Sequence, residues 1–365
     1  MLVIGGGPAG AAAAITLARA GIRCAVLESR STPGWKIGET LAPEARQLLH
    51  VLGVGDEFER SGHLPSPGNV SIWGGDEPTA KDFIFNPHGC AWQLDRPTFE
   101  SMLLAAAEAA GAGVWRGHPT RTIRRLPGAW EVGAGDRMIR AAWLVDATGR
   151  GSSLARQFGG MARENLDQLV AVHAVVPTRA DTEADARTWI EATEHGWWYS
   201  ARIPGGQRVF AFQTDADLLL GQPWRSWPWF QRQLGKTRYL GTLSSFSTPE
   251  TMASGWVPDR MPKMTSARSG RLETGHGDGW VAVGDAAQSF DPLSGAGLHH
   301  ALLTGRHAAQ GLLENLARTK DGLDDYAALV RSLWDRFLLQ RRDCYTQETR
   351  WPKAPFWFRR RPQAG

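Results

Sequence analysis

Short apolar runs alternate with glycine-rich turns and a helical stretch at the start of the chain. Residues 2–4 (Leu-Val-Ile) form an apolar run that ends in glycines, residues 11–19 are rich in alanine, and residues 23–27 form a second apolar run. A short apolar run bounded by glycine predicts a buried strand, and an alanine-rich stretch predicts a helix. The pattern therefore predicts a β-α-β unit, the beginning of an α/β fold with a parallel sheet.

Later segments predict three other kinds of element. Residues 280–283 form another apolar run, followed closely by a long helical stretch. Alternation of apolar and polar residues at 197–203 and 208–212, with a Pro-Gly-Gly turn between them, predicts antiparallel strands. Between residues 326 and 338, large apolar residues recur at helical spacing. These predict an amphipathic helix packed against the body of the protein.

The turn after the first apolar run carries a Gly-x-Gly-x-x-Gly motif. Gly5 allows the tight turn, Gly7 lets a pyrophosphate approach the backbone, and Gly10 lets the helix pack closely on the strand. Glu28 ends the second apolar run, where an acid accepts hydrogen bonds from a ribose, and the anion sits on the N–H groups of the helix. The predicted dinucleotide contacts of this unit are Gly5, Gly7, Pro8, Ala9, Gly10, Glu28 and Ser29.

A second motif lies almost three hundred residues later. The run 280–283 continues into Gly284-Asp285, and residues 291–297 (Asp-Pro-Leu-Ser-Gly-Ala-Gly) open a long helix. This pair of segments resembles the second flavin-contact region of FAD enzymes of the p-hydroxybenzoate hydroxylase superfamily, where the aspartate binds ribityl or ribose hydroxyls. The resemblance implies that the dinucleotide is FAD rather than NAD.

Three further segments resemble the same superfamily. Residues 94–103, which contain Arg96, resemble a helix start whose arginine reaches toward the cofactor, and residues 143–150 resemble a strand with an Ala-Thr-Gly turn. Residues 35–43 resemble the Gly-Glu-(Ser/Thr)-x-x-Pro segment of the tryptophan-halogenase-like subgroup, in which the nearest likeness is to the LodB/QhpG-like flavoproteins of tryptophylquinone biogenesis. The resemblance adds these cofactor contacts: Lys36, Arg96, Thr148, Gly149, Asp285, Pro292, Gly295, Ala296 and Gly297.

The predicted fold class is α/β, with a Rossmann-like FAD-binding domain of the p-hydroxybenzoate hydroxylase/glutathione reductase type. A mainly antiparallel β substrate domain is inserted into it, and a helix follows at the C-terminus. The predicted discontinuous FAD-binding domain comprises residues 1–67, 94–168 and 270–320. The predicted substrate domain comprises 68–93 and 169–269, and residues 321–365 form the helix and a basic, aromatic tail.

The resemblance implies a monooxygenase that hydroxylates an aromatic substrate through a flavin C4a-hydroperoxide. We expect the helix start at 293–297 to place N–H groups against the reduced flavin, and Pro292 to shape the oxygen pocket. The predicted catalytic residues are Pro292, Gly295, Gly297 and His299. The substrate is an aromatic small molecule or a Trp-containing polypeptide, and the reductant is NAD(P)H or a separate flavin reductase.

Three alternatives remain open. A flavin-dependent halogenase of this family uses a lysine after the Gly-Glu motif, yet no lysine occurs between Lys36 and Lys81, and residues 196–204 only loosely echo the family's Trp-x-Trp-x-Ile-Pro motif. A geranylgeranyl-reductase-like enzyme would share the cofactor motifs. A flavin-bearing maturation or binding partner would use the flavin without catalysing the oxidation.

Seventeen tryptophans are the second peculiarity of the chain. A tryptophan fills a core or stacks on a planar guest equally well, and for any one of them the core role is the commoner. Because several fall in the predicted substrate domain, an aromatic-lined cavity is expected there. Its predicted lining residues are Trp197, Trp198, Phe210 and Phe212.

Composition adds limits on location and partners. The formal net charge of +4 comes from mixed charges with no basic stripe, so no nucleic-acid partner is expected. The basic excess clusters at residues 359–361, in a tail expected to be solvated or to dock an acidic partner. Three cysteines without paired spacing predict no disulfide framework and no metal site, which fits a reducing cytoplasm. No apolar run long enough to span a membrane is found.

Overall fold

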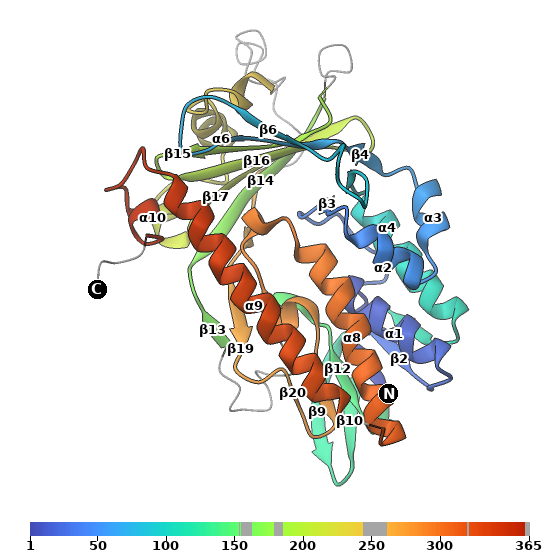
Figure 1. The fold of residues 1–365 in the computed structure, drawn as a ribbon. Helices are drawn as coiled ribbons and strands as arrows, with labels where there is room; N and C mark the ends of the chain where they lie inside the picture. The colour runs from blue at the N-terminus through green and yellow to red at the C-terminus, as the bar shows by residue number, and fades with distance from the viewer. Residues whose placement is uncertain (153, 155–162, 179–184, 244–260, 320, 362–365) are drawn as a thin grey trace. The chain divides into compact units, whose positions relative to one another are not determined.

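The computed structural model describes residues 1–152, 154, 163–178, 185–243, 261–319 and 321–361. Some residues of all three predicted regions lie outside the described residues. The chain divides into two compact units, each built from three separate segments (Figure 1). Unit 1 comprises Met1–Gly62, Asp95–Leu166 and Ser269–Phe337, and unit 2 comprises His63–Leu94, Asp167–Arg268 and Leu338–Gly365.

Unit 1 is built on a six-stranded sheet in the order β20-β21-β12-β1-β2-β8. All neighbouring strands pair in parallel except β20, which is antiparallel to β21. This arrangement confirms the predicted Rossmann-like architecture. The strands are β1 (Leu2–Ile4), β2 (Ala25–Glu28), β8 (Gly113–Arg116), β12 (Leu144–Asp146), β20 (His276–Gly277) and β21 (Trp280–Ala282).

The helices of unit 1 begin where the sequence supplies helix starts. Pro8 occupies the first turn of one helix, and the Asp95 side chain accepts a hydrogen bond from Thr98 N at 3.0 Å at the start of another. α1 and α8 lie side by side in Figure 1. The helices are α1 (Pro8–Arg19), α2 (Ala45–Val51), α3 (Gly55–Arg60), α4 (Arg96–Ala109) and α8 (Gly297–Ala317).

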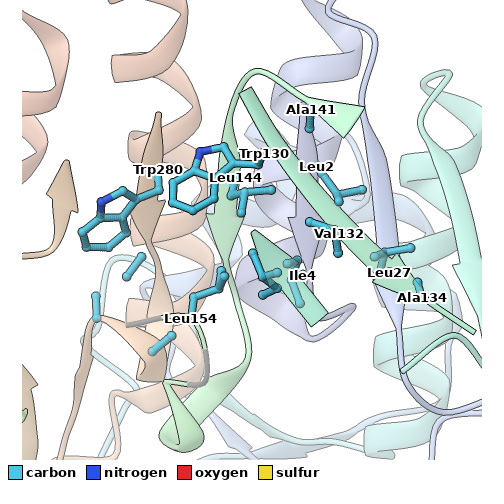
Figure 2. Packing of buried hydrophobic residues seen from close by; sticks show 14 of the residues in the cluster. Leu2, Ile4, Leu27, Trp130, Val132, Ala134, Ala141, Leu144, Leu154 and Trp280 are labelled. Carbon is cyan, nitrogen blue, oxygen red and sulfur yellow. The ribbon is translucent and has the colours of Figure 1, made fainter. Parts of the chain in front are cut away.

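Small strands complete unit 1. An antiparallel meander consists of β9 (Thr120–Leu126), β10 (Ala129–Ala134) and β11 (Arg137–Ala141). Its apolar face joins that of the six-stranded sheet in one core, where Trp130 lies near Leu144 and Trp280 (Figure 2). The remaining strands are β3 (Thr40–Leu41) and a three-stranded sheet of β13 (Arg163–Asn165), β19 (Gly270–Leu272) and β22 (Gln288–Ser289).

Unit 2 contains a seven-stranded sheet in the order β18-β14-β17-β16-β15-β5-β6. Its neighbours pair antiparallel except β15 and β5, so the predicted mainly antiparallel domain is confirmed. The helix α6 (Trp227–Leu234) packs its aromatic residues against one face. The strands are β5 (Gly68–Ile72), β6 (Thr79–Asp82), β14 (Leu169–Pro177), β15 (Thr188–Thr193), β16 (Gly196–Ile203), β17 (Gln207–Asp215) and β18 (Lys263–Ser266), and β4 (Leu64–Ser66) pairs with β7 (Ala91–Gln93) beside them.

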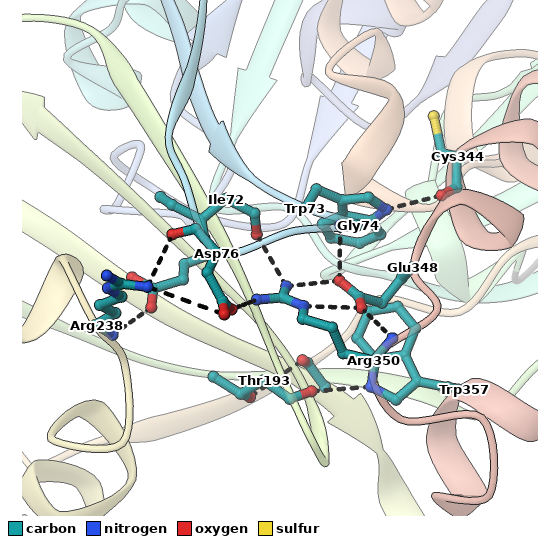
Figure 3. Close-up of polar contacts among 12 residues, drawn as sticks. Ile72, Trp73, Gly74, Asp76, Thr193, Arg238, Cys344, Glu348, Arg350 and Trp357 are labelled. Atoms are coloured by element: carbon teal, nitrogen blue, oxygen red, sulfur yellow. Dashed lines mark hydrogen bonds and ion pairs between the residues drawn. The ribbon is translucent and has the colours of Figure 1, made fainter.

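The long helix predicted after residue 322 is α9 (Gly322–Gln347), and the division between the units falls within it. In unit 2, Trp73 Nε1 donates to Cys344 O at 2.7 Å, and the Glu348 carboxylate accepts from Gly74 N and from Arg350 (Figure 3). A last short helix, α10 (Pro355–Phe358), follows. Across the described ranges, no helix is both long enough and apolar enough to cross a membrane.

The basic residues after α10 are held by carboxylates of unit 2. Arg360 donates to both oxygens of the buried Asp215 carboxylate at 2.6 and 3.0 Å. Arg359 bonds both Asp215 and Asp217. Because these charges are paired within the unit, residues 359 and 360 of the expected solvated tail are instead bound to unit 2.

Candidate functional site

The first glycine motif forms the turn between β1 and α1. Gly5 has a φ of +109°, and a Cβ there would lie 2.3 Å from Ala147 O, while a Cβ on Gly10 would lie 2.0 Å from Gly5 O. A Cβ on Gly7 would have no atom within 4 Å. The fold therefore requires glycine at positions 5 and 10, whereas Gly7 borders open space.

That open space suits a pyrophosphate. Gly7 is the N-cap of α1, and the N–H groups of the first helical turn have no acceptor within the helix. Together with the positive end of the helix dipole, they favour an anion at this place. Pro8 and Ala9 lie buried in that first turn. The residues present thus fit the diphosphate of a dinucleotide.

Glu28 ends β2 beside this turn. Its Oε2 accepts from Gly6 N at 2.8 Å, and its Oε1 accepts from Arg30 N at 2.9 Å and from Ser29 Oγ at 3.2 Å. These bonds fix the carboxylate next to the glycine turn. Ribose hydroxyls could donate to the same oxygens, because a carboxylate has about four lone-pair sites.

A buried carboxylate to which the sequence analysis assigned no role lies on α4, within the segment that contains Arg96. Glu100 is 3% exposed and accepts from Lys36 Nζ at 2.6 Å and from Arg96 Nη2 at 2.5 Å. Arg96 Nη1 also donates to Gly38 O at 2.7 Å. The two predicted cofactor residues Lys36 and Arg96 therefore converge on one acid. The spacing of Arg96 and Glu100 by one helical turn is the signal that could have revealed it.

The Ala-Thr-Gly turn follows β12 next to the glycine motif. Asp146 is fully buried, and its Oδ1 accepts from both Thr148 N and Thr148 Oγ1, at 3.0 and 2.7 Å. Ala147 N donates to Ile4 O at 2.9 Å, which links the turn to β1. Gly149 has a φ of +72°. Thr148, whose backbone N would lie 3.3 Å from a Cβ on Gly5, thus lies beside the glycine turn.

The second glycine motif follows β21 and packs against the start of α1. A Cβ on Gly284 would lie 2.8 Å from the Cβ of Ala9, and Gly284 N donates to Thr304 Oγ1 at 2.9 Å. The Asp285 carboxylate, 33% exposed, pairs with Arg150 Nε at 3.1 Å. Asp285 is therefore accessible to a hydroxyl donor while its charge is balanced.

Arg163 is hydrogen-bonded to residues around this loop, and no sequence pattern predicted this role. Its guanidinium donates to Ser152 Oγ, Ser289 Oγ and the carbonyl of Gly270. Burial lowers the pKa of Arg163, and the charge of Asp285 acts in the opposite direction. Its partners lie between 11 and 126 residues away in the sequence, so only the fold shows that they meet.

The start of α8 carries the predicted catalytic segment. Asp291 is buried and its Oδ1 accepts from Leu293 N at 3.0 Å, which turns the chain at Pro292. Gly295 has a φ of +61°, and a Cβ on Gly295 or Gly297 would meet no atom within 4 Å. Ala296 is the N-cap. The exposed helix start thus offers N–H groups and a positive dipole end without side chains in the way.

Two histidines follow on the first turn of α8. Burial, together with the positive charges of His299 and Arg336, lowers the pKa of His300 to about 4. The His300 ring packs edge-on against Phe290, with centroids 4.5 Å apart. His300 is therefore neutral at pH 7, and its ring is packed against Phe290. The role of His299 in proton handling stays a prediction.

The four predicted substrate-lining residues do not form one wall. Trp198 stacks on Phe212 and meets Phe230 of α6, each with centroids 5.1 Å apart, and Phe210 lies in the same core. Trp197, the residue before Trp198 on the strand, points to the opposite face of the sheet. There its Nε1 donates to Tyr345 OH at 3.2 Å. Three of the four residues thus fill the core beneath α6.

The comparison with protein families decides the cofactor. Residues 1–333 match the family described as FAD binding domain. The chain belongs to this FAD-binding family. This member is an FAD-dependent oxidoreductase. Within the described residues, no group of three or more His, Cys, Asp or Glu side chains is placed to hold a metal.

Similar proteins include both chemistries. LodB of Marinomonas mediterranea, named as an FAD-dependent oxidoreductase, is 30% identical over 98% of this chain and 96% of its own. The structure of the flavin-dependent halogenase CmlS has a TM-score of 0.86 at 22% identity, covering 100% of this chain and 68% of its own. The peptidyl tryptophan dihydroxylase QhpG, essential for tryptophylquinone cofactor biogenesis, has a TM-score of 0.78 at 24% identity, covering 100% and 79%. These two structures show that this FAD-binding protein shares their fold.

Proposed function

We propose that the protein is a monooxygenase that hydroxylates an aromatic ring, specifically the indole of a tryptophan residue in a partner polypeptide. Reduced FAD and dioxygen together supply one oxygen atom to the ring, while the second oxygen leaves as water. The electrons come from NAD(P)H, directly or through a separate flavin reductase. Similarity to LodB over nearly the whole chain and the peptidyl substrate named for QhpG support this choice.

The observation that carries the proposal concerns lysine. In the halogenases that the sequence resembles, a lysine after the Gly-Glu motif holds the hypohalous acid, yet no lysine lies between Lys36 and Lys81. Lys36 itself is paired with the buried Glu100. Lys81 lies on the exposed strand β6 of unit 2. The chain thus has no lysine where those halogenases carry theirs, while it keeps the glycine motifs that are expected to bind FAD.

The start of α8 suits the oxygenation site. Its N–H groups and dipole favour negative charge, which a reduced flavin carries at its pyrimidine edge. Gly295 and Gly297 leave room for the flavin to approach the helix start closely. Pro292 has no N–H, so its backbone offers no hydrogen-bond donor to the oxygen. We assign proton handling to His299 and substrate recognition to unit 2. The three cysteines without a disulfide fit a cytoplasmic enzyme.

A second candidate is halogenation, which the fold similarity to CmlS favours. Both candidates are tested by the mass of the product. The FAD-loaded protein, a flavin reductase and NADH are mixed with a tryptophan-containing peptide under isotopically labelled dioxygen, with chloride and bromide present. We expect labelled oxygen in the peptide. A halogen in the product supports the second candidate. A peptide that stays unchanged, together with free tryptophan that stays unchanged in a parallel reaction, contradicts both.

A further inference from the structure

Glu100 holds together two cations of the cofactor-binding unit. Lys36 Nζ and Arg96 Nη2 each lie within hydrogen-bond distance of a different oxygen of its carboxylate. Burying a carboxylate costs free energy unless it is paired and hydrogen-bonded. The three side chains together carry one net positive charge, since two cations meet one anion.

The bonds of Glu100 reach the loop between β2 and β3. Residues 29–39 form neither helix nor strand, and they follow directly after Glu28. Lys36 is bonded to Glu100 itself, and Gly38 is held through Arg96, whose Nη1 donates to its carbonyl. Two points of an irregular loop are thus fixed to one helix.

The same face of α4 also reaches the glycine turn. Arg96, Glu100 and Leu104 are spaced by four residues, so they lie on one face of the helix. A Cβ on Gly6 would lie 3.2 Å from Leu104 Cδ2, which places the far end of this face at the turn. Glu100 is about 6 Å along the helix axis from Leu104, at 1.5 Å of rise per residue. Along α4, the cation cluster therefore lies about one helical turn from the residue that packs against the glycine turn.

We propose that Glu100 is a positioning residue for FAD: it holds Lys36 and the Gly38 backbone in the arrangement that cofactor binding uses. A loop that is ordered before binding does not lose its conformational freedom when the cofactor arrives. The surplus positive charge then lies where the dinucleotide is anionic. This inference depends on FAD binding and not on the substrate, so a failure of the proposed hydroxylation would leave it standing.

The test replaces Glu100→Gln, which keeps the size of the side chain and removes its charge. We expect the dissociation constant of FAD, measured by fluorescence titration of the apoprotein, to rise about tenfold, because charge-assisted hydrogen bonds are lost. Glu108→Gln is the matched control on the same helix. Glu108 pairs with Arg116 on the surface, and its loss should leave the affinity within about twofold.

A double-mutant cycle separates positioning from general damage. If Glu100 acts through Lys36, Glu100→Gln weakens FAD binding less in a Lys36→Met background than in the wild type. Lys36→Met should also reduce the salt dependence of binding, and Glu100→Asp should restore part of the affinity. Should Glu100→Gln fail to fold by circular dichroism, the Lys36→Met and Glu100→Asp variants carry the test. FAD affinity that is unchanged in these variants, or effects of Glu100 and Lys36 that add in full, would overturn the proposal.

Discussion

Gly305 of α8 rests directly against the backbone of Ala9 in α1. A Cβ on Gly305 would lie 2.1 Å from Ala9 O, which is closer than a real Cβ approaches another atom, and 3.1 Å from Ala9 Cα. Ala9 belongs to the first turn after the N-terminal glycines, and Gly305 belongs to the helix that follows the second glycine motif. The contact therefore joins the two halves of the cofactor site, which are far apart in sequence.

Gly305→Ala is expected to destabilise the protein by about 1–3 kcal/mol, the usual cost of overpacking. In an open helix the same change stabilises by about 0.5–1 kcal/mol, so the sign of the effect reports the contact. Urea unfolding monitored by circular dichroism gives the free energy, and FAD titration should show weaker binding because α1 must shift. Leu316→Ala, at an exposed position of the same helix, is the control.

Gly7→Ala and Gly10→Ala are expected to fail in different ways. Gly7 has a φ of −70°, which alanine adopts without strain, and its Cβ would enter open space. That variant should fold with near wild-type stability and bind FAD more weakly, because the methyl group occupies the place of the pyrophosphate. A Cβ on Gly10 would clash with Gly5 O, so that variant should lose stability even without cofactor. Thermal unfolding of both apoproteins, followed by FAD titration, distinguishes the two; equal loss of stability would refute the distinction.

His173 is expected to make unit 2 less stable in mild acid. Burial and the nearby Lys263 lower the pKa of His173 from 6.5 to about 4. Between these values the unfolded chain binds more protons than the folded one, so stability is present above 6.5 and falls by about 3 kcal/mol as the pH drops to 4. His173 Nε2 lies 3.0 Å from Thr265 Oγ1, and His173→Gln keeps a hydrogen-bonding partner for that hydroxyl. This variant should flatten the pH dependence in urea unfolding. His195→Gln, at an exposed side chain, should leave the slope as it is.

Trp198→Ala is expected to act on stability rather than on substrate binding. The Trp198 ring is fully buried between Phe212 and Phe230, and removing it leaves a cavity that costs about 3–5 kcal/mol. Trp198→Phe should cost less, because it keeps an aromatic ring and the Nε1–H has no hydrogen-bond partner among the described residues. Unfolding free energies and the KM for the peptide are measured for both. A raised KM with unchanged stability would restore Trp198 to the substrate site.

The cofactor unit could be predicted from sequence because its constraints are local. Gly5 and Gly10 are dictated by backbone geometry within one turn, and Glu28 follows at the fixed length of one β-α-β unit. The strand after residue 280 carries a similar short pattern. Such motifs can be recognised without knowledge of the tertiary contacts. The first one predicted a dinucleotide site, and the family resemblance of the second implied that the dinucleotide is FAD.

The contacts that sequence could not supply are long-range or depend on side-chain direction. Trp197 and Trp198 are adjacent in sequence, and grouping them overlooked the fact that neighbours in a strand face opposite sides. Arg360 looked like part of a solvated basic tail because its carboxylate partner, Asp215, is 145 residues away. Glu100 lay within a motif, yet its two cations come from different segments. In each case the residues are plain in the sequence, but only the fold shows which of them contact each other.

The pairing of Asp215 with Arg360 couples two distant parts of unit 2. The carboxylate at the end of β17 is buried, and its cation lies 145 residues further along, just after α10. A buried charge that loses its partner destabilises the fold by more than the pair itself contributes. We therefore expect the seven-stranded sheet and the segment after α10 to unfold as one cooperative unit, and a proteolytic cut between them to weaken the sheet.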